Sequence, residues 1–340
     1  FTGSAAAVDS KIVANSEVGS VSKALEGTVA GLQSFSSSGQ PGEDATILIR
    51  GVGSVNASTA PLYVVDGVPY AGTLSSLVPS DIESITVLKD AAAAALYGSR
   101  AANGVIMIST KQGSKESAPV INFSAKSGFS GHAISDYKQL STDQYFQLQW
   151  EAMKNGQIDQ GSDESDAAQY ASQHLTEALG INPYGSDKYP QPVDTNGKLV
   201  SGAKPLWNDS WYDALTQKAQ YTDINLNISG GSKNSKYFLS GEYLNNKGLY
   251  IESGFKRYAL RANVTSDIKK WLQVGLNLSG TYTKQEYPTQ DDSQIENVVQ
   301  FARSVPSFYP VYERNLQTGA YLLDKNGDRI YDYGNYRPPS

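Results

Sequence analysis

The feature that most constrains this fold is a two-residue alternation of apolar and polar side chains in the second half of the chain. It is clearest in WLQVGLNLSGTYT at residues 271–283. The aliphatic positions there are Leu272, Val274, Leu276 and Leu278. A period of two places all four on one face of a β-strand, so the segment is predicted to be a strand with one apolar face.

Four more segments alternate in the same way, at 120–131, 223–231, 235–246 and 257–268. Lengths of roughly ten residues match the ~9–11 residues of a tilted transmembrane strand. Phe238 and Leu244 break strict alternation within their segment. We predict five antiparallel strands of a transmembrane β-barrel. A soluble antiparallel β-sandwich also alternates and stays the alternative.

Average hydropathy does not decide between a transmembrane β-barrel and a soluble β-sandwich. No apolar run approaches the ~20 residues of a membrane helix, which excludes helical spans only. Barrel strands alternate lipid-facing and lumen-facing residues, so their membrane character is lost in an average. The 22 tyrosines and 31 glycines are typical of barrels with aromatic girdles and tight turns.

Charge and residue content exclude several functions. A balance of 28 Lys+Arg against 34 Asp+Glu gives a net charge of −6, which leaves general nucleic-acid binding without an electrostatic basis. The absence of cysteine excludes disulfides, thiolate nucleophiles and Cys–zinc sites. Neither His132 nor His174 has metal-ligand spacing to a second histidine. We find no catalytic constellation and predict no enzyme activity, cofactor or metal.

Two short patterns resemble ligand loops. Gly51 and Gly53 suggest a dinucleotide loop, but Asn56 stands at its third glycine position. DKNGDRI at 324–330 suggests a calcium loop, but its glycine stands at loop position four rather than six. We predict a hairpin turn at Asn326–Gly327 instead.

The first half of the chain predicts a compact α+β domain. Short β-branched runs predict strands at 46–49, 62–65, 82–88 and 105–110. An Ala-rich helix is predicted from Asp90 to Gly98. A second helix is predicted from Ser20 to Gly31, because Val21, Leu25, Val29 and Leu32 recur at helical spacing. Residues 34–44 are predicted to be a flexible turn region. Together these elements predict a small mixed sheet flanked by helices.

The amino-acid sequence of residues 44–113 is more specific than this order of predicted strands and helices. In order it contains IRG before a polar loop, LYVVDGVP, IESITVLKD, ALYGSRAANGVI and ISTK. This resembles the plug domain of TonB-dependent outer-membrane transporters, and its form is most similar to the SusC-like branch.

The resemblance implies an α+β plug domain at 1–116, followed by transmembrane barrel strands at 117–340. Long extracellular loops are expected at about 132–220 and 284–340. Helices are predicted inside the first loop at 139–156 and 166–180. SusC-like proteins have about 22 strands, so five strands imply a partial barrel, the N-terminal portion of such a protein.

The implied function is active import of glycans or oligopeptides across the outer membrane of a Gram-negative, Bacteroidota-type bacterium. The plug would lie in the barrel lumen, and the outer face of the barrel would contact outer-membrane lipid. A TonB–ExbB–ExbD complex would supply the energy, although no TonB box is visible in this chain. A SusD-like surface lipoprotein would close the outer mouth.

The resemblance also implies ligand-binding residues. Two outward loops of the plug are expected to form the cavity floor: Ser54, Asn56, Ser58 and Thr59 in one, and Tyr70, Thr73 and Leu74 in the other. Hydroxyls and amides satisfy sugar or peptide polar groups, and Tyr70 offers a stacking face.

A second candidate cluster is aromatic, formed by Trp207, Trp211 and Tyr212 in the first long loop. Aromatic faces stack on sugar rings, but the same side chains suit an interfacial belt or packing at a strand end.

Two other functions stay open. A siderophore or cobalamin transporter has the same architecture. A soluble surface adhesin would combine an α+β domain with a β-sandwich. The sequence leaves glycan and peptide cargo undecided.

Overall fold

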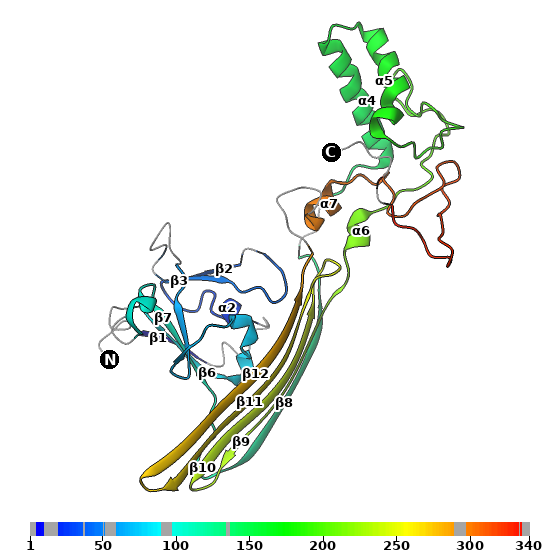
Figure 1. Cartoon of the computed structure of the whole chain (residues 1–340). Helices are drawn as coiled ribbons and strands as arrows, with labels where there is room; N and C mark the ends of the chain where they lie inside the picture. The colour runs from blue at the N-terminus through cyan, green and yellow to red at the C-terminus, as the bar shows by residue number, and fades with distance from the viewer. Residues whose placement is uncertain are drawn as a thin grey trace. The chain divides into compact units, whose positions relative to one another are not determined.

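A computed structural model describes residues 5–9, 20–36, 38–49, 51, 59–89, 97–133, 137–288, 297–332 and 334 (Figure 1). The chain divides into two compact units. The first comprises 1–131 and 218–287, and the second 132–217 and 288–340. Among the described helices, none has the length and apolar character needed to cross a membrane.

The plug is built on a five-stranded mixed sheet in the order β1-β6-β7-β4-β5. The strands are β1 (Ala5–Asp9), β6 (Ile82–Leu88), β7 (Val105–Thr110), β4 (Leu62–Val65) and β5 (Val68–Pro69). β4 pairs with β7 in parallel, and the other described pairs are antiparallel. The mixed sheet and the predicted bounds of β4, β6 and β7 are therefore confirmed.

The fourth predicted strand, β3 (Thr46–Ile49), is confirmed as well but lies outside the mixed sheet. It pairs antiparallel with β2 (Leu32–Phe35), which covers the first two residues of the segment predicted to be a flexible turn. The sequence prediction also missed β1, because its run of small residues has little strand character.

The predicted helix from Ser20 to Gly31 is wrong in length. Helix α2 spans only Val21–Ala24, and Gly27 follows with a left-handed φ of 69°. Such a backbone favours glycine and ends a helix. The predicted apolar positions still lie in the plug core. The start of the Ala-rich helix, Asp90–Leu96, lies outside the described residues, and the segment closes in the 3-10 helix η3 (Gly98–Ala101).

A tight turn joins β4 to β5 and sets the position of one carboxylate. Asp66 and Gly67 have φ values of 49° and 85°. Positive φ at both central residues is the requirement of a type I′ hairpin turn, which Asp-Gly satisfies well. The turn holds the Asp66 side chain beside Thr110.

Five long strands form a separate antiparallel sheet, referred to here as the wall. In order they are β12 (Leu272–Glu286), β11 (Gly254–Lys269), β10 (Ser235–Lys247), β9 (Ala219–Gly231) and β8 (Ser117–Ser130). Figure 1 shows them as one long curved sheet. The five predicted strands are confirmed. They are longer than the predicted ten residues, because pairing continues beyond the apolar stretch of each segment.

The wall has an apolar outward face and a polar inward face that meets the plug. The outward residues Leu272, Val274, Leu276 and Leu278 are 38–61% exposed. The inward residues of β9 include Asn225 and Asn227, which are 5% and 8% exposed. A soluble sandwich would bury the leucines and expose the asparagines, so this polarity is that of a barrel wall.

The two residues that broke the alternation are explained by the plug. Phe238 and Leu244 share the inward face of β10 with Ser240 and Glu242. Both apolar side chains are buried there. A wall covered by a plug tolerates apolar groups on its inner face, whereas an open aqueous lumen would not.

A row of tyrosines crosses the outward face near one end of the wall. Tyr243, Tyr258 and Tyr282 are paired in register, with ring centroids 5.1 Å and 6.3 Å apart. The next outward positions along the strands are polar, including Lys256 and Lys284. An aromatic row between an apolar band and charged residues is typical of a membrane interface.

The second unit contains helices α4 (Thr142–Asp159), α5 (Glu164–Leu179), α6 (Trp211–Leu215) and α7 (Val298–Ser304). The two long helices confirm the predictions for 139–156 and 166–180, with shifted ends. Ser141 and Gln144 form a capping box at the start of α4. Gly180, with φ 69°, ends α5 in the left-handed conformation. The hairpin turn predicted at Asn326–Gly327 is confirmed by the bridge between Leu323 and Arg329.

Candidate functional site: the plug–wall interface and the cavity beside it

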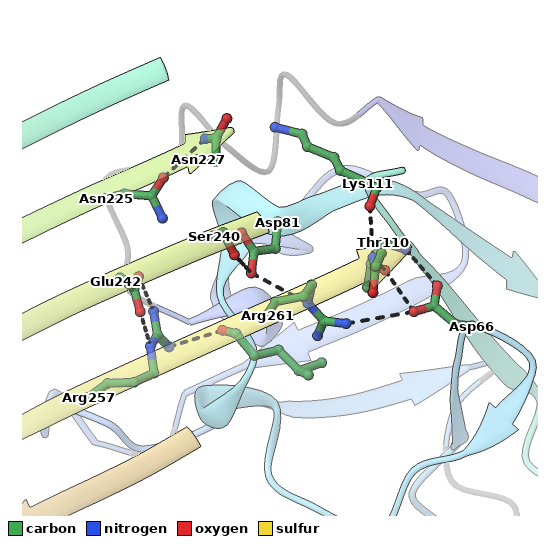
Figure 2. A network of polar contacts seen from close by, with 12 residues as sticks. Asp66, Asp81, Thr110, Lys111, Asn225, Asn227, Ser240, Glu242, Arg257 and Arg261 are labelled. Atoms are coloured by element: carbon green, nitrogen blue, oxygen red, sulfur yellow. Dashed lines mark hydrogen bonds and ion pairs between the residues drawn. The ribbon is translucent and has the colours of Figure 1, made fainter. Parts of the chain in front are cut away.

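Polar side chains of β10 and β11 point toward the plug (Figure 2). The inward set is Ser240, Glu242, Arg257 and Arg261, labelled in Figure 2, together with Asn263, which is buried on the same face of β11. Alternation along each strand places them on one face, and the register of β10 with β11 brings them side by side.

Arg257 is 1% exposed, as deeply buried as Asn263. It binds Glu242 in a two-pronged contact, with Nε–Oε2 at 2.6 Å and Nη2–Oε1 at 2.8 Å. Its Nη1 donates to the plug carbonyls of Ser75 at 2.5 Å and Leu77 at 3.0 Å. The guanidinium therefore joins the wall to the backbone of the plug around the 3-10 helix η1 (Leu74–Ser76).

A second wall arginine lies between two plug carboxylates. Arg261 Nε is 3.4 Å from Asp81 Oδ2, and Arg261 Nη1 is 3.8 Å from Asp66 Oδ2. Ser240 Oγ donates to Asp81 Oδ2 at 2.8 Å. Among the described residues, neither Arg261 Nε nor Asp81 Oδ1 has a well-aligned hydrogen bond. Arg261 is therefore held mainly by electrostatic attraction to the carboxylates of Asp81 and Asp66, which depends little on hydrogen-bond alignment.

Burial sets the ionisation of the plug carboxylate at this contact. Removal from water raises the pKa of the Asp81 carboxyl above its ordinary value of 3.8. The hydrogen bond from Ser240 and the charge of Arg261 oppose that increase without cancelling it. The contacts from the wall thus offset only part of the desolvation free energy of the Asp81 carboxylate.

The third contact between wall and plug is made by the amide side chain of Asn263. Asn263 Nδ2 donates to Thr110 Oγ1 at 3.0 Å and to the carbonyl of Lys111 at 2.8 Å. Asp66 accepts from Thr110 N at 2.8 Å and from Thr110 Oγ1 at 2.7 Å. The Asp66–Gly67 turn, the end of β7 and the wall are thereby linked in one chain of hydrogen bonds.

These contacts suit a domain that separates from its wall. Each is a hydrogen bond or an ion pair, and the apolar core of the plug lies within the plug itself. Because Glu242 belongs to the wall, Arg257 keeps its carboxylate partner when the plug carbonyls leave. Separation therefore leaves no unpaired charge at Arg257.

A cavity of about 610 Å³ lies beside this interface, between a plug loop and the ends of the wall strands. The plug contributes Gln40, Pro41, Gly42 and Glu43, and the wall contributes Lys126, Tyr221 and Asn246. The volume falls within the ~300–1,000 Å³ of ligand pockets. Lys126 and Tyr221 lie near the strand ends that border the long segment between β8 and β9, and Asn246 lies at the end of β10 before its short connection to β11.

Close packing fixes the plug loop over this cavity. Gly42 has a φ of 80°, and a Cβ there would lie 2.1 Å from the ring of Phe255. The neighbouring carbonyl of Pro41 accepts a hydrogen bond from Gln285 Nε2 at 3.0 Å. Glycine is therefore required at position 42 for the loop to reach the wall.

Of the predicted plug-loop ligands, those that the structure describes, Thr59, Tyr70, Thr73 and Leu74, do not line this cavity. Ser54, Asn56 and Ser58 lie outside the described residues. Thr59 is partly exposed, Thr73 is exposed, and the Tyr70 hydroxyl contacts Ser76. Leu74 is buried in the plug core, so its side chain presents no surface to a ligand in this arrangement.

The three predicted aromatic residues occur in the second unit, where they are engaged in packing. Trp207 is buried and donates from Nε1 to the carbonyl of Phe308 at 2.8 Å. Trp211 donates to the carbonyl of Tyr309 at 2.8 Å and meets Phe301 edge-on at 5.0 Å. Tyr212 packs against the ring of His132.

Sequence reasoning missed the residues that do line the cavity. Gln40 and Glu43 lie in the segment predicted to be a flexible turn, and the wall contributors are inward positions near strand ends. One signal was present: polar residues such as Lys126 and Asn246 occupy the faces opposite the aliphatic rows. Choosing the inward polar positions nearest the long segment between β8 and β9 would have selected Lys126 but not Asn246, which borders the short β10–β11 connection.

Comparisons with known proteins agree with this architecture. Residues 1–105 match the family described as TonB-dependent Receptor Plug Domain. The TonB-dependent receptor P3 of Formosa agariphila is 34% identical over 92% of this chain and 26% of its own length. The TonB-dependent receptor SusC of Bacteroides thetaiotaomicron is 33% identical over 77% of this chain and 23% of its own.

Among solved structures, the RagAB peptide importer in its closed-closed state superposes with a TM-score of 0.73 and 32% identity. The match covers 99% of this chain and 36% of that one. The chain therefore spans about a quarter of the length of the curated relatives and about a third of the structural one. On the plug match, these relatives and the wall geometry, the chain belongs to the SusC-like family of TonB-dependent transporters.

Proposed function

We propose that the protein containing this chain imports oligomeric nutrients, glycans or oligopeptides, across the outer membrane of a Gram-negative bacterium. The observation that carries the proposal is the polarity of the wall, with aliphatic rows facing outward and a hydrogen-bonded plug on the inner face. Such a wall suits lipid on one side and a closed passage on the other.

The domain boundaries and ligand residues form part of the same proposal. The plug is assigned to 1–116, and the barrel with its loops at about 132–220 and 284–340 to 117–340. Thr59, Tyr70 and Thr73, with Ser54, Asn56 and Ser58, line the floor of the passage. The aromatic residues Trp207, Trp211 and Tyr212 stabilise the loop that approaches the cargo.

The cavity beside the interface extends this ligand surface. Tyr221 provides a ring for stacking, while Gln40 and Asn246 provide amides that suit the hydroxyls of a sugar or the amides of a peptide. Its volume accommodates a few residues of an oligomer rather than a whole chain.

The proposed partners are a SusD-like surface lipoprotein and the TonB–ExbB–ExbD complex. Support for the lipoprotein comes from the relatives, which include SusC and the RagAB peptide importer. The RagAB name gives a peptide cargo, and the resemblance of the sequence to the SusC-like branch implies glycans as well, so both cargo classes are tested together.

Uptake by a deletion strain tests the proposal. The strain is complemented with the full-length transporter, and labelled oligosaccharides, oligopeptides and a ferric siderophore are supplied in separate arms. We expect loss of one oligomer class on deletion and reduced uptake with the double variant Tyr221→Ala/Asn246→Ala. Lys256→Ala, on the outward face, serves as the control. Loss of siderophore uptake alone would establish the siderophore alternative and refute the proposal.

Migration on gels tests the barrel against the soluble adhesin. A closed barrel migrates differently before and after boiling, whereas a β-sandwich adhesin is expected to show no such shift and to stay in the aqueous fraction.

A further inference from the structure

The segment that joins the plug to the wall, residues 111–116, is called the linker here. Lys111 has a partner on each side. Its N donates to the plug carbonyl of Asp81 at 2.8 Å, and its carbonyl accepts from Asn263 Nδ2 of the wall at 2.8 Å. Gly113 to Glu116 contact the wall instead. The change from plug partners to wall partners therefore falls at residues 111–112.

Gly113 is buried and packs its backbone against the backbone of the wall. A Cβ at this position would lie 2.2 Å from the carbonyl oxygen of Tyr237, 2.5 Å from its N and 2.6 Å from the carbonyl oxygen of Gly230. Tyr237 and Gly230 are paired between β10 and β9, so their backbone atoms are held in the ladder and cannot turn aside. Position 113 is therefore restricted to glycine by close approach of two backbones.

The wall has a matching glycine for the linker. A Cβ at Gly231, the last residue of β9, would lie 2.3 Å from the carbonyl oxygen of Ser114. Neither Gly113 nor Gly231 has a positive φ, so close packing and not backbone conformation explains both glycines. The linker and the end of β9 fit together because each lacks a side chain at the point of contact.

Two polar contacts extend this attachment to neighbouring parts of the wall. Glu116 N donates to the carbonyl of Ser232, in the turn between β9 and β10, at 3.1 Å. Glu116 has a φ of 52°, which is uncommon for a residue other than glycine and persists where the surroundings fix it. Lys115 forms an ion pair with Asp267 near the end of β11. The linker is thus attached to β9, β10 and β11.

This attachment differs from the contacts made by the body of the plug. Arg261 and Asn263 reach the plug through side chains, which can rotate away. The linker also lies at the opposite end of the wall from the cavity, because the cavity is lined by the end of β8 and the start of β9. A plug that turns about the linker moves least at Thr110 and most at the loop around Gly42.

We propose that Gly113 anchors the plug. Residues 113–116 stay on the wall throughout the transport cycle, and the plug turns about residues 111–112. The inference rests on the proposed function, which supplies the transport cycle, and adds a fixed point to it. A plug with this fixed point opens the passage on the cavity side and remains attached at the other end.

Tethering distinguishes a fixed linker from a moving one. The full-length transporter carries Lys115→Cys/Asp267→Cys, joined by a bis-thiosulfonate reagent long enough to replace the ion pair. Uptake of labelled oligosaccharides and oligopeptides is measured separately in the deletion strain. We expect uptake to continue at the untethered rate. The matched pair Asp81→Cys/Ser240→Cys links the body of the plug to the wall and should stop uptake. Uptake that stops when the linker is tethered, and returns on reduction, would overturn the anchor.

Gly113→Ala tests the residue itself. Its methyl group would meet backbone atoms of the wall, so we expect the linker to be displaced and uptake to be lost. Tethering through Lys115→Cys/Asp267→Cys in the same variant should restore part of the uptake, which a general folding defect would not allow. Gly131→Ala is the matched control at the other end of β8, where a Cβ would meet nothing within 4 Å. Equal uptake by Gly113→Ala and Gly131→Ala would refute the role of Gly113.

The remaining outcomes separate this inference from the proposed function. If the wild type imports neither class of oligomer, the import function fails and the anchor with it. If the wild type imports one class and the Asp81–Ser240 tether leaves uptake unchanged, the plug does not turn and only the anchor is refuted. Heat-modifiable migration shows whether Gly113→Ala is folded, and if it is not, the linker tether in the otherwise unchanged transporter decides.

Discussion

At the scale of single residues, Arg257 decides how the plug is held. Its side chain is almost fully buried, and Glu242 and two plug carbonyls use its donors. A buried ion pair contributes little compared with well-packed apolar groups, but removal of one partner leaves an uncompensated charge. The sequence shows an arginine in a strand, and only the fold shows which groups it joins.

We therefore predict that Arg257→Ala destabilises the docked plug by about 3–5 kcal/mol, because Glu242 is left buried without its partner. Arg257→Lys should restore only part of the loss, since an ammonium cannot reproduce the two-pronged contact. The double variant Arg257→Met/Glu242→Leu should recover most of it. Urea titration of the transporter, followed through protease cleavage of the plug, measures these differences, and Lys256→Ala on the outward face is the control. A double variant less stable than Arg257→Ala would contradict this account.

Asp81 provides a prediction on pH. Its pKa is raised by burial when the plug is docked, and exposure to water on release is expected to bring it back toward the ordinary value of 3.8. The docked state therefore retains the proton more tightly, and docking weakens as pH rises above 3.8 until the carboxyl is ionised in both states. Asp81→Asn should remove this part of the pH dependence. The urea midpoint for plug release, measured from pH 4 upward, tests it, with Asp159→Asn at the exposed end of α4 as control. Equal pH profiles for Asp81→Asn and wild type would refute the role of this carboxyl.

At the scale of elements, the strands of the wall were the most predictable part. Their period of two follows from β geometry alone, and five runs of alternation became five strands. Helix α2 was the least predictable, because apolar spacing of three to four residues also fits a short helix followed by glycine turns. Apolar periodicity determined which residues enter the core but left the length of the helix open.

Neighbouring positions on β12 test the two faces of the wall. Leu276 lies on the outward face and Asn277 on the inward face. We predict that Leu276→Arg destabilises the barrel by about 2–4 kcal/mol, because a charge near the bilayer midplane loses its hydration. Asn277→Arg adds the same charge on the lumen side and should cost under about 1 kcal/mol. Unfolding of the full transporter in lipid bilayers measures both. Equal effects at the two positions would refute the lipid-facing assignment.

At the scale of the molecule, the plug has its own core and meets the wall through polar contacts. Separation of the two therefore breaks these hydrogen bonds and ion pairs, and it also exposes the buried inward side chains Phe238, Leu244 and Phe255 of the wall. This is the arrangement expected of a passage that opens by moving its plug.

Tethering tests that movement, and the absence of cysteine from this chain simplifies it. The pair Asp81→Cys/Ser240→Cys, joined by a short bis-thiosulfonate reagent, links plug to wall at a contact of 2.8 Å. We expect uptake to stop on tethering and to return on reduction. The pair Ser235→Cys/Ser266→Cys is the control, because it links two wall strands whose hydroxyls are also 2.8 Å apart. Uptake that continues with the plug tethered would show that the plug stays in place during transport.

The sequence by itself determined the strands, the faces of the wall and the apolar residues of the plug core, because these depend on local periodicity that any fold must respect. The tertiary structure decided which polar residues matter. Arg257 meets Ser75 across 182 positions, Ser240 meets Asp81 across 159, and Gly42 accommodates the ring of Phe255. Such partners are brought together by the packing of one domain against another, and no local pattern records them.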